Sequence, residues 1–194
     1  MRKSLVLLAI GLLVGLGAVQ AQAGSFALLP PTQEVMVGDT VTLGVTMDFS
    51  TDPTVGGGLD IFYDPAVLSY QDFVFATELN FDFGFTGAPV LVSPGVLQNL
   101  YIGNFSGLAG PALVGTLTFS ADAMGTSLLT MADSALAAAD GGAGPFYSAA
   151  TFAEQVVDYT GAEVNVNVVP IPGSVLLLGS GLVGLVGVRR RRSG

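Results

Sequence analysis

The central part of this chain contains no side chain that carries a positive charge. Between Gly24 and Val168 there are fifteen Asp and Glu residues but no Lys, Arg or His, and the 194-residue chain has no Cys. Its six basic residues lie near the ends, at Arg2, Lys3 and 189–192. The central segment therefore has a formal charge of −15, against −9 for the whole chain. It must fold without salt bridges between side chains and without disulfides. About 145 residues are enough for one domain with its own apolar core.

The same composition excludes several classes of function. Phosphate binding needs cations, so we expect no nucleic-acid partner. Thiolate metal sites and redox chemistry need Cys, and a nucleophilic Ser needs a base such as His or Lys. Two carboxylates could serve a glycosidase, but Asp60 and Asp64 lie in a strand-and-turn context where Asp64 is better explained as the cap of the following turn. We therefore expect no catalytic residues and no enzymatic activity.

Short alternating runs indicate an all-β segment. Residues 40–47 and 163–168 alternate polar or small residues with apolar ones, which is the period of a half-buried strand. Turn signals rich in Gly and Pro separate the runs, among them Gly56-Gly57-Gly58. One helix-like stretch, 131–140, is too short for more than a turn or two. Eight or nine short strands without a long amphipathic helix predict a β-sandwich. The other expected strands are 58–63, 68–75, 96–105, 112–120 and 127–131.

Three stretches of the segment resemble the cohesin-like jelly roll, a fold related to several carbohydrate-binding modules. They are Val37-Gly38-Asp39-Thr40-Val41-Thr42-Leu43, Gly57-Gly58-Leu59-Asp60-Ile61-Phe62-Tyr63-Asp64-Pro65-Ala66-Val67-Leu68, and Val114-Gly115-Thr116-Leu117-Thr118-Phe119. Gly38 permits the positive φ of a turn into the first long strand, and Asp64-Pro65 opens a short helical turn after which Leu68 enters the core. The exposed sheet face of cohesins proper binds a dockerin, so the resemblance implies contacts through a sheet face.

The N-terminus has the order of an export signal. A short basic region precedes an apolar core, Leu5 to Val19, and Ala21-Gln22-Ala23 forms a small-x-small cleavage site. We therefore expect residues 1–23 to be a signal peptide that is removed before Gly24. A retained signal anchor, the alternative, would need no such cleavage site.

The C-terminus has three parts in a fixed order. Val169-Pro170-Ile171-Pro172-Gly173-Ser174 precedes an apolar stretch, Val175 to Val188, and then Arg189-Arg190-Arg191-Arg192. A helix from Ile171 to Val188 has 18 residues. At ~1.5 Å per residue it is about 27 Å long, just short of the roughly 30 Å hydrocarbon core of a bilayer. Basic residues beside a membrane segment stay in the cytoplasm, so we expect everything before Val169 to lie outside.

This order of parts resembles the PEP-CTERM sorting signal of Gram-negative bacteria, which is recognised by an exosortase, a membrane-embedded cysteine transpeptidase. Ile171 stands where the commonest motif has Glu, as in the Val-Pro-Leu-Pro variants of the family. The resemblance implies that residues 169–194 hold the chain briefly in the inner membrane, and that processing sends it to the cell surface or extracellular matrix. The alternative is an ordinary tail anchor. Two prolines close to the membrane and a helix rich in Gly argue against it.

Acidic loops and aromatic side chains are the candidate binding features of residues 24–168. Asp48 and Asp52 flank a loop whose oxygens could bind calcium, although a solvated acidic surface explains the same residues and no EF-hand or RTX repeat is present. Phe81, Phe83 and Phe85 share one parity, which predicts that they face the core. Five Tyr residues could stack on sugar rings, but the absence of Trp weakens that interpretation. They are Tyr63, Tyr70, Tyr101, Tyr147 and Tyr159.

The function that these features favour is a non-catalytic, exported surface or extracellular-matrix protein. Its sandwich would make adhesive or structural contacts with exopolysaccharide or with another surface protein, and an exosortase would sort it. A carbohydrate-binding module is the alternative, and a carboxylate-based glycosidase comes third. We expect no cofactor, with calcium as the one ion that the acidic loops could hold.

The missing cations predict a salt-dependent stability. Fifteen carboxylates repel one another more in the compact fold than in the expanded unfolded chain. Screening, with a Debye length of about 10 Å at 0.1 M salt, should therefore raise the melting temperature of residues 24–168 gradually as sodium chloride is added. Occupied calcium sites would add a saturable increment that magnesium at equal ionic strength does not reproduce. A melting temperature indifferent to salt would show that charge repulsion does not limit the fold.

Overall fold

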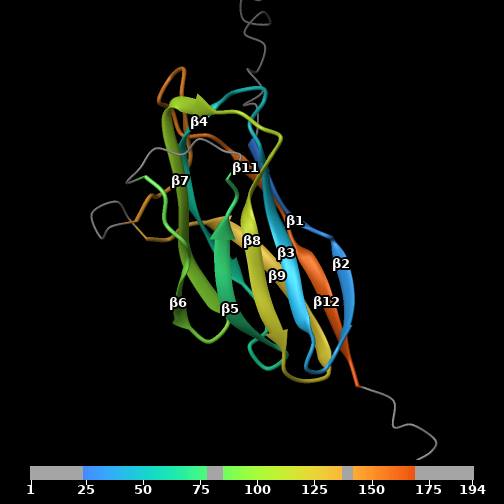
Figure 1. Ribbon diagram of the computed structural model, residues 1–194. Helices are drawn as coiled ribbons and strands as arrows, with labels where there is room; N and C mark the ends of the chain where they lie inside the picture. Colours follow the sequence, from blue (N-terminus) through green and yellow to red (C-terminus); the bar gives the residue numbers. More distant parts are fainter. Residues whose placement is uncertain (1–23, 78–84, 137–141, 169–194) are drawn as a thin grey trace, which may run out of the picture.

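Two β-sheets pack face to face to form the protein (Figure 1). The computed structural model describes residues 24–77, 85–136 and 142–168, which contain twelve strands and no helix. The all-β prediction is confirmed, but the estimate of eight or nine strands is too low. The strands are β1 (Gly24–Leu29), β2 (Thr32–Met36), β3 (Thr40–Asp48), β4 (Thr54–Phe62), β5 (Leu68–Phe75), β6 (Val90–Ser93), β7 (Val96–Leu108), β8 (Ala112–Ala121), β9 (Gly125–Asp133), β10 (Tyr147–Ser148), β11 (Val157–Thr160) and β12 (Ala162–Asn167).

The strand order defines two open flanks of the sandwich. The five-stranded sheet has the order β11-β1-β3-β8-β5, and the seven-stranded sheet has the order β2-β12-β9-β4-β7-β6, with β10 paired to β4. In Figure 1, β2 and β12 lie at the right, whereas β6 lies at the lower left beside β5. The strands β5 and β6 therefore end their sheets on the same flank.

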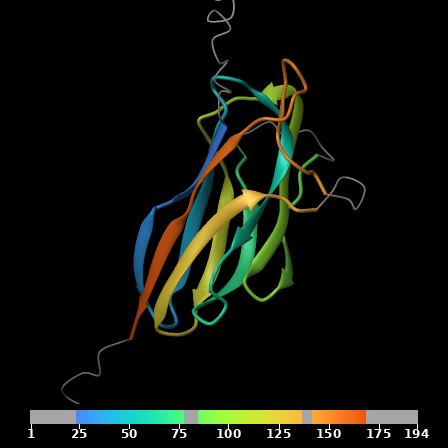
Figure 2. The same ribbon diagram turned by 180° about the vertical axis from the view of Figure 1, so that it is seen from behind.

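The chain crosses from one sheet to the other at both of its ends. The strand β1 pairs in parallel with β11 in the five-stranded sheet, and the following strands β2 and β12 pair in parallel in the seven-stranded sheet. Gly24 pairs with Val157 at the start of this path, and Asn167 pairs with Met36 at its finish. Gly24 and Asn167 therefore lie at opposite ends of the sandwich, as the blue and orange strands show in Figure 2.

The core follows the alternation of the strands. In β3 the side chains of Val41, Leu43, Val45 and Met47 are buried, while those between them face outward. The largest fully buried side chains include four rings, Phe26, Phe49, Phe119 and Phe146. All members of the core cluster come from residues 24–168. The described residues therefore pack around one hydrophobic core.

Several local predictions are confirmed. Gly38 has a φ of +94° in the turn before β3. The carboxylate of Asp64 accepts the N–H of Ala66 at 2.8 Å, and its carbonyl oxygen accepts the N–H of Leu68 at 3.0 Å, so Asp64 begins a turn of helical type. The side chain of Leu68 is fully buried.

The prediction of a turn at Gly56-Gly57-Gly58 is wrong, because these residues lie inside β4. A Cβ on Gly57 would come within 2.6 Å of the ring of Phe146, and one on Gly56 would overlap the carbonyl oxygen of Ile102. The N–H of Gly58 donates to the carbonyl oxygen of Gly144, and the N–H of Ser134 donates to the carbonyl oxygen of Gly58, both at 2.8 Å. Glycine in this strand therefore marks a close approach of backbone, as is usual for glycine within a sheet.

Two further predictions need correction. Met131 to Asp133 are the last residues of β9 and not part of a helical turn, and Ser134 to Leu136 are not helical either. Phe85 is exposed and does not face the core. The rest of the 131–140 stretch, and Phe81 and Phe83, lie outside the described residues.

Among the residues that the structure describes, no helix is long and apolar enough to cross a membrane. The cleavage site residues Ala21 and Ala23, the motif 169–174, the apolar stretch 175–188 and the arginines 189–192 lie outside the described residues. Gly24, the expected first residue of the processed chain, begins β1.

Candidate functional site

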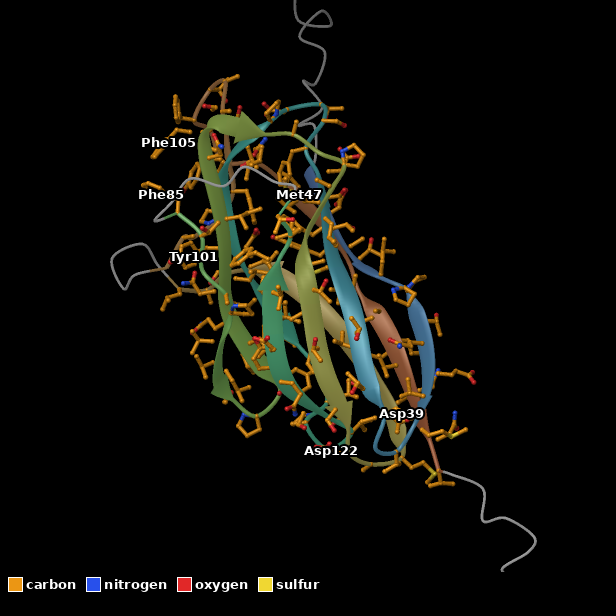
Figure 3. The ribbon with its side chains drawn as sticks, in the orientation of Figure 1. Asp39, Met47, Phe85, Tyr101, Phe105 and Asp122 are labelled. Carbon is orange, nitrogen blue, oxygen red and sulfur yellow. The ribbon has the colours of Figure 1, made fainter. Side chains whose placement is uncertain are left out.

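A pocket of about 290 Å³ lies on the outer side of the seven-stranded sheet, where β4 begins and β7 approaches its end. We call it the aromatic pocket. Three aromatic side chains and a floor of backbone form most of it: Phe85, Tyr101, Phe105, Gly56, Gly103 and Ala143. In Figure 3 the three labelled rings follow one flank of the molecule along β7. None of the described residues that line the pocket is charged.

Close backbone contacts hold the aromatic side chains in place. Gly87 and Tyr101 exchange two backbone hydrogen bonds of 3.0 and 3.1 Å. A Cβ on Gly87 would overlap the ring of Tyr101, so any larger residue there would displace the ring from its present position. The rings of Phe85 and Phe105 meet edge to face with centroids 4.8 Å apart, a favourable aromatic geometry.

Glycine also gives the pocket its depth. Gly56 has a φ of +133°, and a Cβ on Gly103 would come within 3.1 Å of both the carbonyl oxygen of Val55 and the Cβ of Phe85. Asn104, the buried amide of the lining, accepts the backbone N–H of Ser106 at 2.7 Å with its side-chain oxygen. The pocket is therefore an apolar recess that suits an aliphatic or aromatic group.

The aromatic pocket lies far from the end where β12 finishes. Val166 pairs with Gly125 at the start of β9, close in sequence to Asp122. In Figure 3, Asp122 and Asp39 are at the lower end of the molecule, whereas Phe105 is near the upper end. The pocket and the exit of the chain at Asn167 therefore lie toward opposite ends of the sandwich.

Behind the pocket, a buried carboxylate ties three segments together. Asp60 in β4 is only 3% exposed, and it accepts the backbone N–H of Asn99 and the hydroxyl of Ser134, both at 2.8 Å, and the N–H of Ala135 at 3.1 Å. The amide oxygen of Asn99 in turn accepts the N–H of Ala143 at 3.2 Å. Asn99 has a positive φ of 62°. Asp60 therefore joins β4 to β7 and to the segment that forms one wall of the pocket.

The two calcium candidates are bound to separate neutral donors. Asp48 accepts the N–H of Ser50 at 2.9 Å, and hydrogen bonds from the side chain and backbone of Ser50 lower the pKa of this carboxyl group. Asp52 accepts the hydroxyl of Ser148 at 2.8 Å, and its carbonyl oxygen accepts the side chain of Gln155 at 2.7 Å. The described parts of the chain hold no group of three His, Cys, Asp or Glu side chains suited to a metal. Calcium binding by Asp48 and Asp52 stays a prediction.

The five tyrosines do not form a common surface. Tyr101 lines the aromatic pocket, and Tyr63 is buried against Phe119. Tyr159 stacks on Phe26 and donates to Asp133 at 2.6 Å; burial, and then this hydrogen bond, raise the pKa of its hydroxyl. Only Tyr101 was both a sequence candidate and a part of the pocket. Phe105 was missed because no local pattern showed that its position in β7 faces outward beside a second ring.

Comparison with solved structures identifies the fold. CaCohA2 from Clostridium acetobutylicum is 18% identical over 77% of this chain and 94% of that chain, with a TM-score of 0.59. The sixth cohesin of scaffoldin B from Acetivibrio cellulolyticus, solved in complex with a Cel5 dockerin, is 15% identical over 75% of this chain and 100% of that chain, with a TM-score of 0.56. A non-cellulosomal cohesin from Archaeoglobus fulgidus is 13% identical over 75% of this chain and 91% of that chain, with a TM-score of 0.55.

No protein-family model and no curated protein matches the chain. At these identities the structural neighbours show the fold alone. The described residues form a cohesin-like β-sandwich.

The hydrogen bonds of Asp60 predict a large effect of its removal. Asp60→Ala would leave three donors without their acceptor, the buried hydroxyl of Ser134 among them, which should lower the free energy of unfolding by roughly 3 kcal/mol. Asp60→Asn keeps one acceptor oxygen and should fall between this variant and the unchanged domain. Urea unfolding of residues 24–168 measures the loss. Asp158→Ala is the control, since Asp158 is an exposed carboxylate in β11. Equal stability of the two Ala variants would contradict the structural role of Asp60.

Proposed function

We propose that this chain is an exported, non-catalytic protein of the cell surface or extracellular matrix whose sandwich binds a protein partner through the aromatic pocket. An exosortase would recognise residues 169–194 and release the chain from the inner membrane of a Gram-negative bacterium. The proposal joins the export and sorting signals of the sequence to the geometry of the pocket.

The position of the pocket carries this proposal. It lies toward one end of the sandwich, and β12 leads the chain out at the other end, at Asn167. A protein attached through its C-terminal residues would therefore present the pocket away from the attachment. This is the arrangement that a surface contact needs.

The chemistry of the pocket favours a protein partner over an enzyme's substrate. The described lining has no charged group, and residues 24–168 contain no His or Lys to serve as a base. Buried aromatic and aliphatic anchors from a partner contribute most of the binding energy of many interfaces. Two of the structural neighbours were solved as complexes, one with CaDoc0917 and one with the Cel5 dockerin, which supports a protein partner for this fold.

A glycan remains the second candidate partner because of two exposed aromatic rings. Phe85 and Phe105 present their rings to solvent at the rim of the pocket, and sugars stack on such rings. The lining of the pocket is mostly apolar, however, and offers few polar groups to pair with sugar hydroxyls. The protein partner is therefore the conclusion, and exopolysaccharide is the alternative.

The sorting proposal predicts what reaches the surface. Mass spectrometry of the protein released from its native host should detect peptides up to the sorting motif and none from Val175 onward. A chain in which all four arginines, 189–192, are replaced by Gln should keep its tail, because the basic cluster that orients residues 169–194 in the membrane for the exosortase is lost. Recovery of the four arginines on surface-exposed protein would contradict the proposal.

The pocket proposal predicts which side chains binding depends on. A random peptide library selected on residues 24–168 should yield peptides with an aliphatic or aromatic anchor. Phe105→Ala should weaken their binding by roughly 30-fold, the effect of losing a strong interface contact of about 2 kcal/mol. Phe152→Ala is the matched control, because Phe152 is 67% exposed against 66% for Phe105 and lies outside the pocket lining.

A glycan array with the same two variants separates the candidate partners. Glycan binding that Phe105→Ala abolishes, without any peptide binding, would favour the carbohydrate-binding alternative. Peptides that bind both variants equally would contradict a role for the pocket.

A further inference from the structure

The edge of the seven-stranded sheet at β6 has an unusual composition. Its four residues, Val90 to Ser93, pair with β7 on one side. No other strand of the described residues pairs with the opposite side. Val90, Leu91 and Val92 are all exposed, so both faces of the strand carry apolar side chains into solvent. We propose that this edge is a contact between two copies of the chain, with β6 of one copy antiparallel to β6 of the other.

Natural sheet edges usually carry a device that prevents such pairing. Charged side chains, especially Lys, are one such device, and residues 24–168 contain no Lys or Arg. Pro89 and Pro94 bracket the strand, and a register shift between Leu91 and Ser93 bends it. These features limit the length of any added pairing to the four residues of β6, but they place no charge against a second copy.

The distribution of charge favours a second copy of the chain as the partner that binds at the β6 edge. All fifteen carboxylates of the chain lie before residue 83 or after residue 121, so the whole sequence of β6, β7 and β8 is uncharged. Two copies, each with fifteen carboxylates, repel each other over most of their surfaces. They can approach most closely where neither presents a carboxylate. A cationic partner would instead be drawn to the acidic parts of the domain.

The sequence of β6 also matches itself. Val90-Leu91-Val92 reads the same in both directions. In an antiparallel pair centred on Leu91, each Leu faces Leu and each Val faces Val of the other copy. A two-fold axis requires this kind of self-complementary surface.

An apolar groove beside β6 extends the contact. It has a volume of about 430 Å³ and lies between β5 and the turn that joins β6 to β7, with Leu68, Tyr70, Leu91 and Val92 in its lining. Side chains that project from β6 of one copy thus meet a recess next to β6 of the other. Ser69 lines this groove and forms a hydrogen bond with Asp122, so Asp122 lies close to the rim. Hydrogen bonds from Ser69 and Ser120 lower the pKa of the Asp122 carboxyl group. Repulsion between such rim carboxylates makes the contact weak at low salt.

A four-residue strand pair is smaller than a standard interface, so the dimer is weak and depends on concentration. Tethered neighbours on one surface have effective concentrations near the millimolar range, which is enough to populate weak contacts. This inference does not depend on the aromatic pocket or on its partner.

The first test uses the absence of cysteine. Leu91→Cys in the full-length chain places two thiols across the two-fold axis at a Cα separation of ~4.5–5.5 Å, within the ~4.4–6.8 Å range of disulfides. Mild oxidation of the exported chain should give the linked dimer at least about tenfold faster than for Leu128→Cys, because pairing raises the effective thiol concentration. Leu128 is 62% exposed on β9, away from the edge. Equal rates for the two variants would overturn the proposal.

Sedimentation of residues 24–168, which contain the hydrophobic core of the described residues, gives the second test. The association constant should increase several-fold between about 0.1 and 1 M sodium chloride, as the Debye length falls from ~10 to ~3 Å. Val90→Glu should abolish association and Leu128→Glu should not, although both add one charge at similarly exposed sites, 61% and 62%. A monomer at all concentrations and salt levels, or equal loss in both variants, would refute the β6 contact.

Discussion

The lack of any cationic side chain between Gly24 and Val168 governs how this fold is held together. Each carboxylate of this segment can therefore form hydrogen bonds only with neutral donors. Asp60 shows the strongest case, because it is buried and still satisfied by two backbone N–H groups and one hydroxyl. Others follow the same rule with one partner residue each: Asp39 with Met36, Asp48 with Ser50, Asp52 with Ser148, Asp64 with Ala66 and Asp133 with Tyr159. Many of these donors are backbone groups at turns, so the acidic residues help to define where strands begin and end.

This use of carboxylates leaves large parts of the surface free of charge. The described acidic residues lie at turns and in strands β2, β3, β4, β5, β9, β11 and β12, whereas β6, β7 and β8 carry none. The aromatic pocket and the β6 edge both lie in that uncharged region. An apolar recess and an apolar edge are therefore properties of the same neutral part of an otherwise acidic domain.

Local sequence predicted the strands of eight or more residues but, apart from β12, not the shorter ones. Alternation identified β3 and β12, and the Asp64-Pro65 turn followed from local hydrogen bonding. The strands β2, β6 and β11 are too short, at four or five residues each, for periodicity to distinguish them from loops. Gly56 to Gly58 suggested a turn because the residues that contact β4 here, Ser134 and Phe146 among them, come from 74 or more residues later in the chain.

The pocket was harder to predict for a similar reason. The parity of Phe85 pointed to the core, and its partner Phe105 lies twenty residues away on β7. Their contact depends on the pairing of Gly87 with Tyr101, which brings the two segments together. No local sequence pattern predicts a backbone pairing between two such distant residues. The one indication in the sequence was that Phe85 and Phe105 lie in the same stretch without charged residues.

The parallel pairing of β2 and β12 has a mechanical consequence. If the chain is held at its C-terminal end while a partner pulls at the aromatic pocket, tension enters the sandwich along the axis of β12. That strand pairs through five residues with β2 on one side and five with β9 on the other. Since the hydrogen bonds between strands run across the strand direction, this force shears both rows at once and cannot open them one after another. The strand β12, which lies nearest the attachment, is therefore pulled in the direction in which its hydrogen bonds resist separation most strongly.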